Sequence, residues 1–345
     1  MIKKLVRPNI LALKPYTSAR DEFKGEASVF LDANENSLGS ATGDWNRYPD
    51  PYQLKVKEKL AKLKGTTPES IFLGNGSDEA IDILFRIFCE PGKDQAVIFA
   101  PTYGMYEVSA NINDVGLIRR NLDANFQLPD DLDFISYLPD DAKLLFICSP
   151  NNPSGNLIDP DKIRRVLKDF GGIVVIDEAY IDFAPEASWL KDLSKYPNLV
   201  ILQTFSKAWG LAALRLGVAY ASPEIIQLMN KVKPPYNINE STQQLALQAL
   251  ENAETVTGFT GEINRLRGEL EQQLGQLPQV KKLYPSDANF ILAEVGNANG
   301  LYNFLTQSGI VVRNRHTVVN NCLRITVGTA DENAALITAI RNFQP

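Results

Sequence analysis

Short apolar runs alternate with helix-like patterns between residue 71 and about residue 222, and this alternation constrains the fold more than any other feature of the sequence. The apolar runs are IFLG, AVIFA, KLLFICS, GIVVIDEAY, LVILQTFS and LGVAYAS, and the helix-like segments include DEAIDILFRIFCE and PDKIRRVLKDF. Continuous apolar runs are typical of strands that are buried on both faces. The alternation therefore predicts an α/β architecture, in which helices cover both faces of a mostly parallel sheet.

The alternation ends at KVKPPYNIN, residues 231–239, which contains two prolines and predicts a domain boundary. A helical pattern from about 241 to 277 follows, and then the strand-like runs NFILAEV, VVRNRH and CLRITVG and the helical DENAALITAIRNF. We therefore expect a large domain over residues 41–235 and a smaller α+β domain over residues 236–345. Residues 1–40 are poor in periodic pattern, and we expect them to form an arm that packs on the small domain and on a partner subunit.

Composition narrows the classes of ligand. The chain of 345 residues has a formal net charge of -6, which argues against a nucleic-acid or anionic-membrane surface, and no apolar segment is long enough to span a bilayer. Cys89, Cys148 and Cys322 are too scattered for a disulfide framework or a zinc site, and His316 has no metal or triad partner at a suitable spacing. We expect reduced thiols, no metal site and a cytoplasmic location, with any anionic ligand bound in a local pocket.

Polar side chains follow the predicted strands, and ligands of parallel sheets gather at the carboxyl ends of strands. In LGNGSDEAI, a turn at Gly76 leads into a helix that starts at Ser77 or Asp78, so its N–H groups could hold a phosphate. A plain helix cap is the ordinary interpretation of that pattern. Asn152 precedes a proline in SPNNPSG, and such a sequence is usually only a turn. Neither pattern decides the function alone.

An acid and a lysine at two further strand ends suggest a more specific chemistry. Asp177 ends an apolar run, where burial of a carboxylate is unfavourable unless a cation or several donors meet it. A protonated pyridine nitrogen is such a cation, and Tyr180 could donate to a phenolic oxygen of the same ring, although both residues are common without a ligand. Lys207 follows a strand-like run that ends at Ser206, with Arg215 eight residues later. Most lysines are solvated surface groups, but a desolvated amine is suited to forming imines with aldehydes.

Taken in order, these loops resemble the fold type I pyridoxal-phosphate enzymes, and among them the class I/II aminotransferase superfamily. The motifs that carry the resemblance are NGSDE, PTYGMY, SPNNPSG, DEAY, SKAWGLAALRLG and CLRITVG. None of them is specific alone, but their order along the chain is. KPYTSAR at 14–20, LDANENSLG at 31–39, RYPDP at 47–51 and PTYGMY at 101–106 are most similar to the histidinol-phosphate aminotransferase family. The chain departs from that family at Trp209-Gly210 and in the short segment between Arg313 and Cys322.

The resemblance implies a large domain with a mostly parallel seven-stranded sheet, and pyridoxal 5'-phosphate bound at its edge. Lys207 would hold the cofactor as a Schiff base and carry a proton, Asp177 would pair with the ring nitrogen, and Tyr180 would hydrogen-bond the ring oxygen. The other implied cofactor contacts are Gly76, Ser77, Asp78, Tyr103, Asn152, Ser206, Arg215 and, from the neighbouring subunit of a homodimer, Tyr48.

The resemblance also implies ping-pong transfer of an amino group from histidinol phosphate to 2-oxoglutarate in histidine biosynthesis. One basic cluster must then bind a phosphate in one substrate and a carboxylate in the other, and bidentate arginine geometry suits both anions. The implied substrate contacts are Arg324 in CLRITVG, Arg313, Tyr16, Asn34 and Asn152. The ordinary interpretation of Arg313 is an exposed strand arginine.

Three other functions fit the same motifs. An aromatic amino-acid aminotransferase or a threonine-phosphate decarboxylase would share the fold, and sequence separates them poorly from the first interpretation. A non-catalytic pyridoxal-phosphate-binding sensor is the third, because related domains occur fused to DNA-binding modules. The sequence before the domain holds no helix-turn-helix pattern or basic extension, which argues against the sensor.

Overall fold

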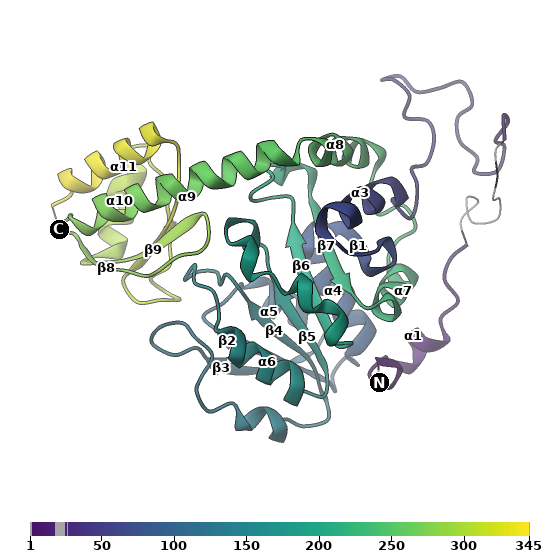
Figure 1. Cartoon of the computed structure of the whole chain (residues 1–345), viewed down its shortest axis with the longest axis horizontal. Coiled ribbons are helices and arrows are strands. Elements are labelled where there is room, and N and C mark those ends of the chain that lie inside the picture. Colours follow the sequence, from purple (N-terminus) through teal and green to yellow (C-terminus); the bar gives the residue numbers. More distant parts are fainter. Residues whose placement is uncertain (1, 18–24, 26, 345) are drawn as a thin grey trace.

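The computed structural model describes residues 2–17, 25 and 27–344 and centres on a seven-stranded sheet (Figure 1). Across the sheet the strands are β1 (Ile71–Asn75), β7 (Leu216–Ala221), β6 (Leu199–Thr204), β5 (Ile173–Asp177), β4 (Ala142–Cys148), β2 (Gln95–Ala100) and β3 (Gly116–Asn121). β7 runs antiparallel to β1 and β6, whereas β6, β5, β4, β2 and β3 pair in parallel. The predicted mostly parallel sheet is confirmed.

One strand, β3, does not correspond to an apolar run of the sequence. Its sequence GLIRRN contains two arginines, and its residues are exposed or half-buried. β3 is one of the two edge strands and pairs with β2; unlike β1 at the other edge, which is mostly buried, it lacks the two-sided burial that makes the other strands recognisable.

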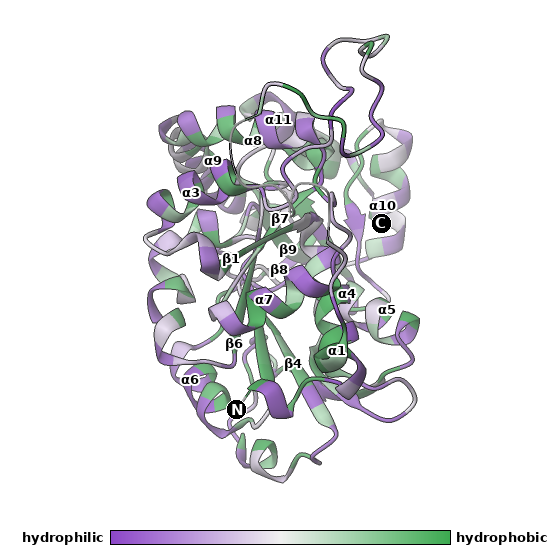
Figure 2. Cartoon of the chain, turned by 90° about the vertical axis from the view of Figure 1, so that its right-hand side faces the viewer, coloured by the Kyte–Doolittle hydropathy of each residue, from purple (hydrophilic) through white to green (hydrophobic). Residues whose placement is uncertain are grey.

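Helices cover both faces of this sheet, as the alternation predicts. One face carries α4 (Gly76–Phe88), α5 (Met105–Ile112) and α7 (Pro223–Val232), and the other carries α3 (Leu54–Lys64), α6 (Pro160–Asp169) and α8 (Glu240–Glu251). Neighbouring strand residues point to opposite faces, so Phe72 packs in the core under α4 while Leu73 packs in the core under α3. Figure 2 shows strands such as β4 and β6 as hydrophobic along their length between these helices.

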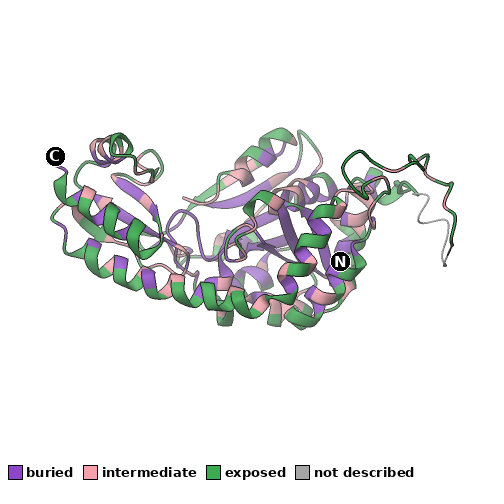
Figure 3. Ribbon diagram, turned by 90° about the horizontal axis from the view of Figure 1, so that it is seen from above, coloured by how far each residue is buried: buried purple, intermediate pink, exposed green. Residues whose placement is uncertain are grey.

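A second, smaller unit follows α8. The helix α9 (Ala253–Gly275) runs to an antiparallel sheet of order β10 (Arg313–Asn314), β11 (Cys322–Thr326), β9 (Phe290–Val295) and β8 (Val280–Leu283), which α10 (Ala298–Gln307) and α11 (Ala330–Asn342) cover. Residues such as Leu270, Ile291 and Leu323 form a separate core there. The smaller α+β unit is confirmed, and Figure 3 shows the buried strands of both sheets.

Short connections complete the chain. They include the 3-10 helices Ile2–Lys4, Pro68–Ser70, Asp133–Tyr137, Ile181–Phe183, Pro185–Ala187, Trp189–Lys195 and Ala212–Leu214. Cys89, Cys148 and Cys322 are unpaired and buried. Across the part of the chain that the structure describes, no helix combines the length and the apolar character needed to cross a membrane.

The division of the chain differs from the expected boundary at residue 235. The helical pattern expected over 241–277 is two helices, α8 and α9, which meet at Asn252. α8 packs on α3, and its Ala246 and Leu250 belong to the core of the large sheet. Packing therefore places α8 with the large unit, because the proline-containing segment before it breaks a helix pattern without separating two cores.

The start of the N-terminal arm also differs from expectation. α1 (Pro8–Ala12) and the residues before it bury Ile2, Val6 and Ile10 in the core that α4 and α7 share. The expectation that the arm packs on the small domain is wrong for residues 2–12, since the small unit lies at the opposite side of the molecule (Figure 1). The physical reason is that these three side chains are apolar and pack in the core of the large unit, where the Arg7 N–H donates to the Ile87 carbonyl of α4 and Lys231 of α7 donates to the Leu11 carbonyl.

Candidate active site

The polar residues at the carboxyl ends of the strands meet in one pocket at the edge of the large sheet. The pocket is lined by Gly76, Ser77, Asp78, Tyr103, Cys148, Asn152, Asp177, Ala179, Tyr180, Thr204, Ser206, Lys207 and Arg215. Every residue predicted to contact the cofactor lines it except Tyr48. Cys148 and Thr204 were not predicted, but each is the last residue of a strand, β4 or β6, so the strand-end rule could have included them.

Asp177 forms the buried base of the pocket. It ends β5 and is only 2% exposed. Its Oδ2 accepts a hydrogen bond from the Tyr106 hydroxyl at 2.7 Å, and its Oδ1 accepts from the Ala179 N–H at 3.0 Å. Burial nevertheless raises the pKa of Asp177 to about 6, against the opposing effect of these bonds. The carboxylate is thus incompletely compensated, and a cation in the pocket would stabilise it.

Tyr106, the last residue of PTYGMY, is a site residue that was not predicted from the sequence. Its ring is fully buried, stacked on Phe146 with centroids 4.7 Å apart and edge-on to Tyr103 at 5.6 Å. The Tyr106 hydroxyl donates a hydrogen bond to the Asp177 carboxylate. The available signal is the spacing of three residues from Tyr103, which puts both rings on the same side of the chain where a helix begins.

Lys207 projects into the pocket just after β6. Its Nζ lies 5.6 Å from the ring centroid of Tyr180. Burial is the main cause that lowers the pKa of Lys207, and the nearby Arg324 lowers it further, while Asp177 opposes both. A lowered pKa leaves more of the amine neutral near pH 7, which is the form that reacts with a carbonyl carbon.

A corner of the pocket is built to hold an anion. Gly76 has φ of 72° and opens α4, and its N–H donates to the Arg215 carbonyl at 2.6 Å. A Cβ at Gly76 would lie 2.7 Å from Arg215 Nη2 and would displace the guanidinium from this position, and the positive φ also favours glycine. Arg215 Nη1 donates to Ser206 Oγ at 3.3 Å, and Nη2 lies 3.7 Å from Asp78 Oδ2. The first N–H groups of α4 lack partners within the helix, so a dianion here meets both donors and a cation.

Arg324 reaches the pocket from β11 in the smaller unit. Its Nη1 donates to Asn152 Oδ1 at 2.6 Å, and its guanidinium lies over the Phe290 ring at 5.1 Å. Phe290 in turn packs edge-on against Tyr180, with ring centroids 5.0 Å apart, and Asn152 Nδ2 donates to the Tyr180 hydroxyl at 3.5 Å. The two units therefore meet at the pocket itself.

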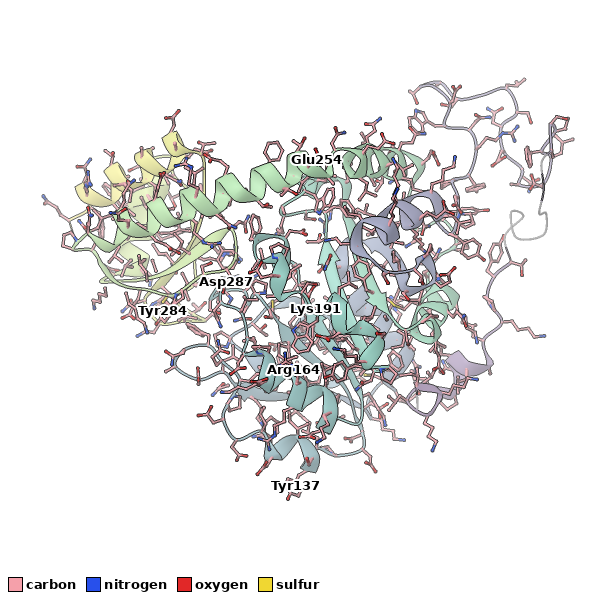
Figure 4. The ribbon with its side chains drawn as sticks, in the orientation of Figure 1. Tyr137, Arg164, Lys191, Glu254, Tyr284 and Asp287 are labelled. Carbon is pink, nitrogen blue, oxygen red and sulfur yellow. The ribbon has the colours of Figure 1, made fainter. Side chains whose placement is uncertain are left out.

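A second contact between the units holds the SPNNPSG loop in place. The Asp287 N–H donates to the Gly155 carbonyl at 2.8 Å, and Asp287 Oδ2 accepts from the Leu157 N–H at 2.9 Å. Gly155 has φ of 88°, and a Cβ there would lie 2.5 Å from Ser286 Oγ. Figure 4 labels Asp287 at this junction. The loop that carries Asn152 is thus fixed by both units.

The remaining predicted residues are not among those that line this pocket within the chain. Tyr16 is 74% exposed beside Pro51, and the rest of its motif, residues 18–20, falls outside the described residues. Asn34 and Tyr48 line a separate groove, where Tyr48 stacks on Tyr236 at 4.5 Å. Arg313 is exposed, directly opposite Arg324 in the β10–β11 ladder. A single chain therefore does not bring the arm residues to the site.

Comparison with known proteins places this site in a family. The model of the aminotransferase class I and II family matches residues 22–340. The chain belongs to the class I and II aminotransferases, which confirms the resemblance inferred from the strand-end motifs.

Individual relatives narrow the comparison. The curated histidinol-phosphate aminotransferase of Parabacteroides distasonis is 54% identical over 346 residues, covering 99% of each chain. The solved histidinol-phosphate aminotransferase from Clostridium acetobutylicum matches with a TM-score of 0.79 and 25% identity, over 86% of this chain and 90% of that one. The enzyme from Sinorhizobium meliloti, solved in complex with pyridoxal-5'-phosphate, matches with a TM-score of 0.77 and 24% identity, over 90% of this chain and 89% of that one. The last comparison bears on the fold alone.

Proposed function

We propose that this chain is a pyridoxal-phosphate-dependent histidinol-phosphate aminotransferase. It converts L-histidinol phosphate and 2-oxoglutarate into imidazole-acetol phosphate and L-glutamate, a step of histidine biosynthesis. The observation that carries the proposal is the 54% identity over nearly the whole of both chains with the P. distasonis histidinol-phosphate aminotransferase. The cytoplasmic location expected from the sequence remains a prediction.

The pocket fits pyridoxal 5'-phosphate on the evidence of its own residues. Asp177 is a buried carboxylate with a raised pKa, which a protonated pyridine nitrogen would compensate. Arg215 and the start of α4 form a corner for the phosphate, and Lys207 offers an amine of lowered pKa for the aldehyde. When bound, the cofactor supplies an electron-withdrawing ring that makes the substrate's α-proton removable.

The residues of the pocket then have distinct tasks. Lys207 would hold the cofactor covalently between turnovers and would move a proton at its Nζ during transfer. Asp177 keeps the ring nitrogen protonated, and Tyr106 positions that carboxylate through its 2.7 Å hydrogen bond. Asn152 and Tyr180 would hydrogen-bond the cofactor, and Tyr103 would contact its ring. Burial raises the pKa of Tyr180, which keeps its hydroxyl a donor.

The substrate anions bind on the side of the smaller unit. Arg324 faces the pocket through its contact with Asn152. Among the described residues its buried Nε has no hydrogen-bond partner, so this N–H can still donate to a bound anion. Arg324 binds the phosphate of one substrate and a carboxylate of the other. Arg313, Tyr16 and Asn34 remain predicted contributors to the same anion site.

We also propose a homodimer in which Tyr48 and the arm complete the neighbouring pocket. Leu31 is 83% exposed and Leu38 is 99% exposed, an unfavourable arrangement for apolar side chains that a partner subunit would correct. Mixing inactive Lys207→Ala subunits with impaired Tyr48→Ala subunits tests the exchange. Hybrid dimers would contain one native site, so activity should recover on mixing; no recovery, although hybrids form, would contradict the shared site.

A direct assay tests the function. Purified protein with bound cofactor is supplied with L-histidinol phosphate and 2-oxoglutarate, and glutamate is measured; we expect steady formation with ping-pong kinetics. Parallel reactions contain L-phenylalanine or L-threonine phosphate as donor. Faster reaction of phenylalanine would favour an aromatic aminotransferase, and carbon dioxide release from threonine phosphate would favour a decarboxylase. Cofactor binding without reaction of any amine would favour a sensor.

A further inference from the structure

Three arginines share one face of the β10–β11 hairpin, and only two of them were considered above. Arg313 lies directly opposite Arg324 in the antiparallel ladder. The Arg315 N–H donates to the Cys322 carbonyl at 2.9 Å, so the pairing continues past the end of β10. Residues two apart on a strand, and residues opposite each other, point to the same face. Arg315 therefore projects on the same side as Arg313 and Arg324, toward the pocket.

The charge of this cluster is not balanced within the described chain. In residues 2–17, 25 and 27–344, none of the three arginines forms an ion pair with an acid. The Nε atoms of Arg315 and Arg324 are buried and have no hydrogen-bond partner among these described residues. Buried donors without acceptors are unfavourable, and three adjacent cations repel one another, so the arrangement is suited to an anion that enters from outside.

The electrostatic effect of Arg315 on Tyr180, which lines the pocket, agrees with a position of Arg315 near the pocket. Burial raises the pKa of Tyr180, and Arg324 and Arg315 both oppose that rise. Burial also lowers the pKa of Arg315, and Arg324 and Arg313 lower it further. These mutual effects agree with the strand geometry, which puts the guanidinium groups on the pocket side of the hairpin.

The backbone that carries Arg315 is held by its own loop. The Arg315 carbonyl accepts from the N–H groups of Val318 at 2.8 Å and Val319 at 2.7 Å. The Asn321 N–H donates to Nδ1 of His316 at 3.1 Å and closes the loop at its other end. A closed loop fixes the starting point of the Arg315 side chain before any ligand binds.

We propose that Arg315 is a specificity-determining residue that binds the substrate phosphate together with Arg324 and thereby favours phosphate-bearing donors over donors that carry only carboxylates. The inference rests on the proposed function and deepens it. A phosphate dianion has more charge and more acceptor oxygens than a carboxylate, so a second guanidinium with free donors benefits the phosphate more.

The test compares Arg315→Gln and Arg315→Lys with the native enzyme, using histidinol phosphate and glutamate as alternative amino donors. Arg341→Gln, at an exposed arginine in the last turn of α11, is the matched control. We expect Arg315→Gln to lower kcat/KM for histidinol phosphate by about 10- to 100-fold, mainly through KM, and that for glutamate by no more than about threefold. Arg315→Lys should recover part of the loss, and the control should change neither donor.

Inorganic phosphate gives a second readout that does not require turnover of the variant. It should raise the melting temperature of the native holoenzyme more than that of Arg315→Gln. Equal losses for both donors, or an unchanged preference together with an equal phosphate shift, would overturn the role of Arg315. A native enzyme that does not accept histidinol phosphate at all would instead overturn the proposed function.

Discussion

The two sides of the pocket are built in different ways. The large-sheet side carries Asp177, Lys207 and Arg215 at the ends of or directly beside long buried strands, and Asp177 and Arg215 are hydrogen-bonded within the chain. The small-unit side carries Arg313 on the two-residue strand β10, Arg315 just after it and Arg324 on β11, and among the described residues the buried Nε atoms of Arg315 and Arg324 have no hydrogen-bond partner. We infer that the core preorganises the first side for the bound cofactor. On the second side, the donors of Arg315 and Arg324 would be satisfied when a substrate anion binds.

The two sides are joined by both polar and apolar contacts. Arg324 contacts Asn152, Asp287 contacts the backbone at Gly155 and Leu157, and Phe290 packs against Tyr180, while the small unit also has a core of its own. Changes on the anion side should therefore leave cofactor binding intact, while changes on the sheet side should abolish chemistry with either substrate.

Lys207→Ala should have the largest effect, because it removes the residue that we propose as both the covalent anchor and the proton carrier. We expect turnover to fall by about 10⁴-fold or more while the cofactor still binds through its phosphate, without the absorbance of the lysine-bound form. Steady-state assays and absorbance spectra measure this. Lys191→Ala, at an exposed lysine that donates to the Glu186 carbonyl, is the matched control. Retained turnover would assign the anchor to another lysine.

Arg324→Ala should weaken the binding of both substrates without affecting the bound cofactor. We expect kcat/KM for both substrates to fall by about 100-fold, because the charge-assisted contact and the hydrogen bond to Asn152 are both lost. The absorbance of the bound cofactor should not change. Loss of that absorbance would show that Arg324 supports the cofactor and that the two sides are not separable.

Asp177→Asn should remove the destabilising effect of the buried Asp177 carboxylate on the cofactor-free protein. The pKa of Asp177 is about 6 in the folded chain and lies near 3.8 otherwise, so the folded state keeps a proton that the unfolded state releases between these values. Stability of the cofactor-free protein should therefore decline as pH rises from 4 to 6 and stay low above it. At pH 8 the substitution should stabilise that form by about 1–3 kcal/mol, and at pH 4 by little. Thermal unfolding at both pH values measures the difference; an equal shift at both would contradict it.

Tyr106→Phe should have the smallest effect of the set. The ring keeps its stacking on Phe146, but Asp177 loses one of its two hydrogen bonds. We expect kcat to fall by about 3- to 10-fold, with cofactor affinity reduced and substrate KM unchanged. Cofactor titration and steady-state kinetics test this. A change in substrate KM with unaltered cofactor affinity would place Tyr106 on the other side of the comparison.

The sheet side could be predicted from the sequence and the anion side only in part. Lys207 and Asp177 follow apolar runs whose carboxyl ends must converge in a parallel sheet, so their proximity follows from the pattern. Tyr106 was not predicted because it lies within α5 and contacts the pocket through Asp177 rather than at a strand end. Tyr16 and Tyr48 line other grooves of the chain, so their predicted roles depend on the proposed dimer.

The fold shows the same division. Buried strands such as β5 are evident from composition, but the outer strand β3 is not, because its arginines face solvent on the open edge. The burial of Ile2, Val6 and Ile10 was not predicted either, because three apolar residues spread over a short segment do not specify which part of the core they pack against.

The most direct test of the account is a half-reaction. Holoenzyme is mixed with L-histidinol phosphate without any keto acid, and the cofactor spectrum is followed. We predict complete conversion from the lysine-bound aldehyde form to the amine form, and its reversal when 2-oxoglutarate is added. A spectrum that histidinol phosphate leaves unchanged, while L-phenylalanine or L-threonine phosphate converts it, would contradict the proposed function.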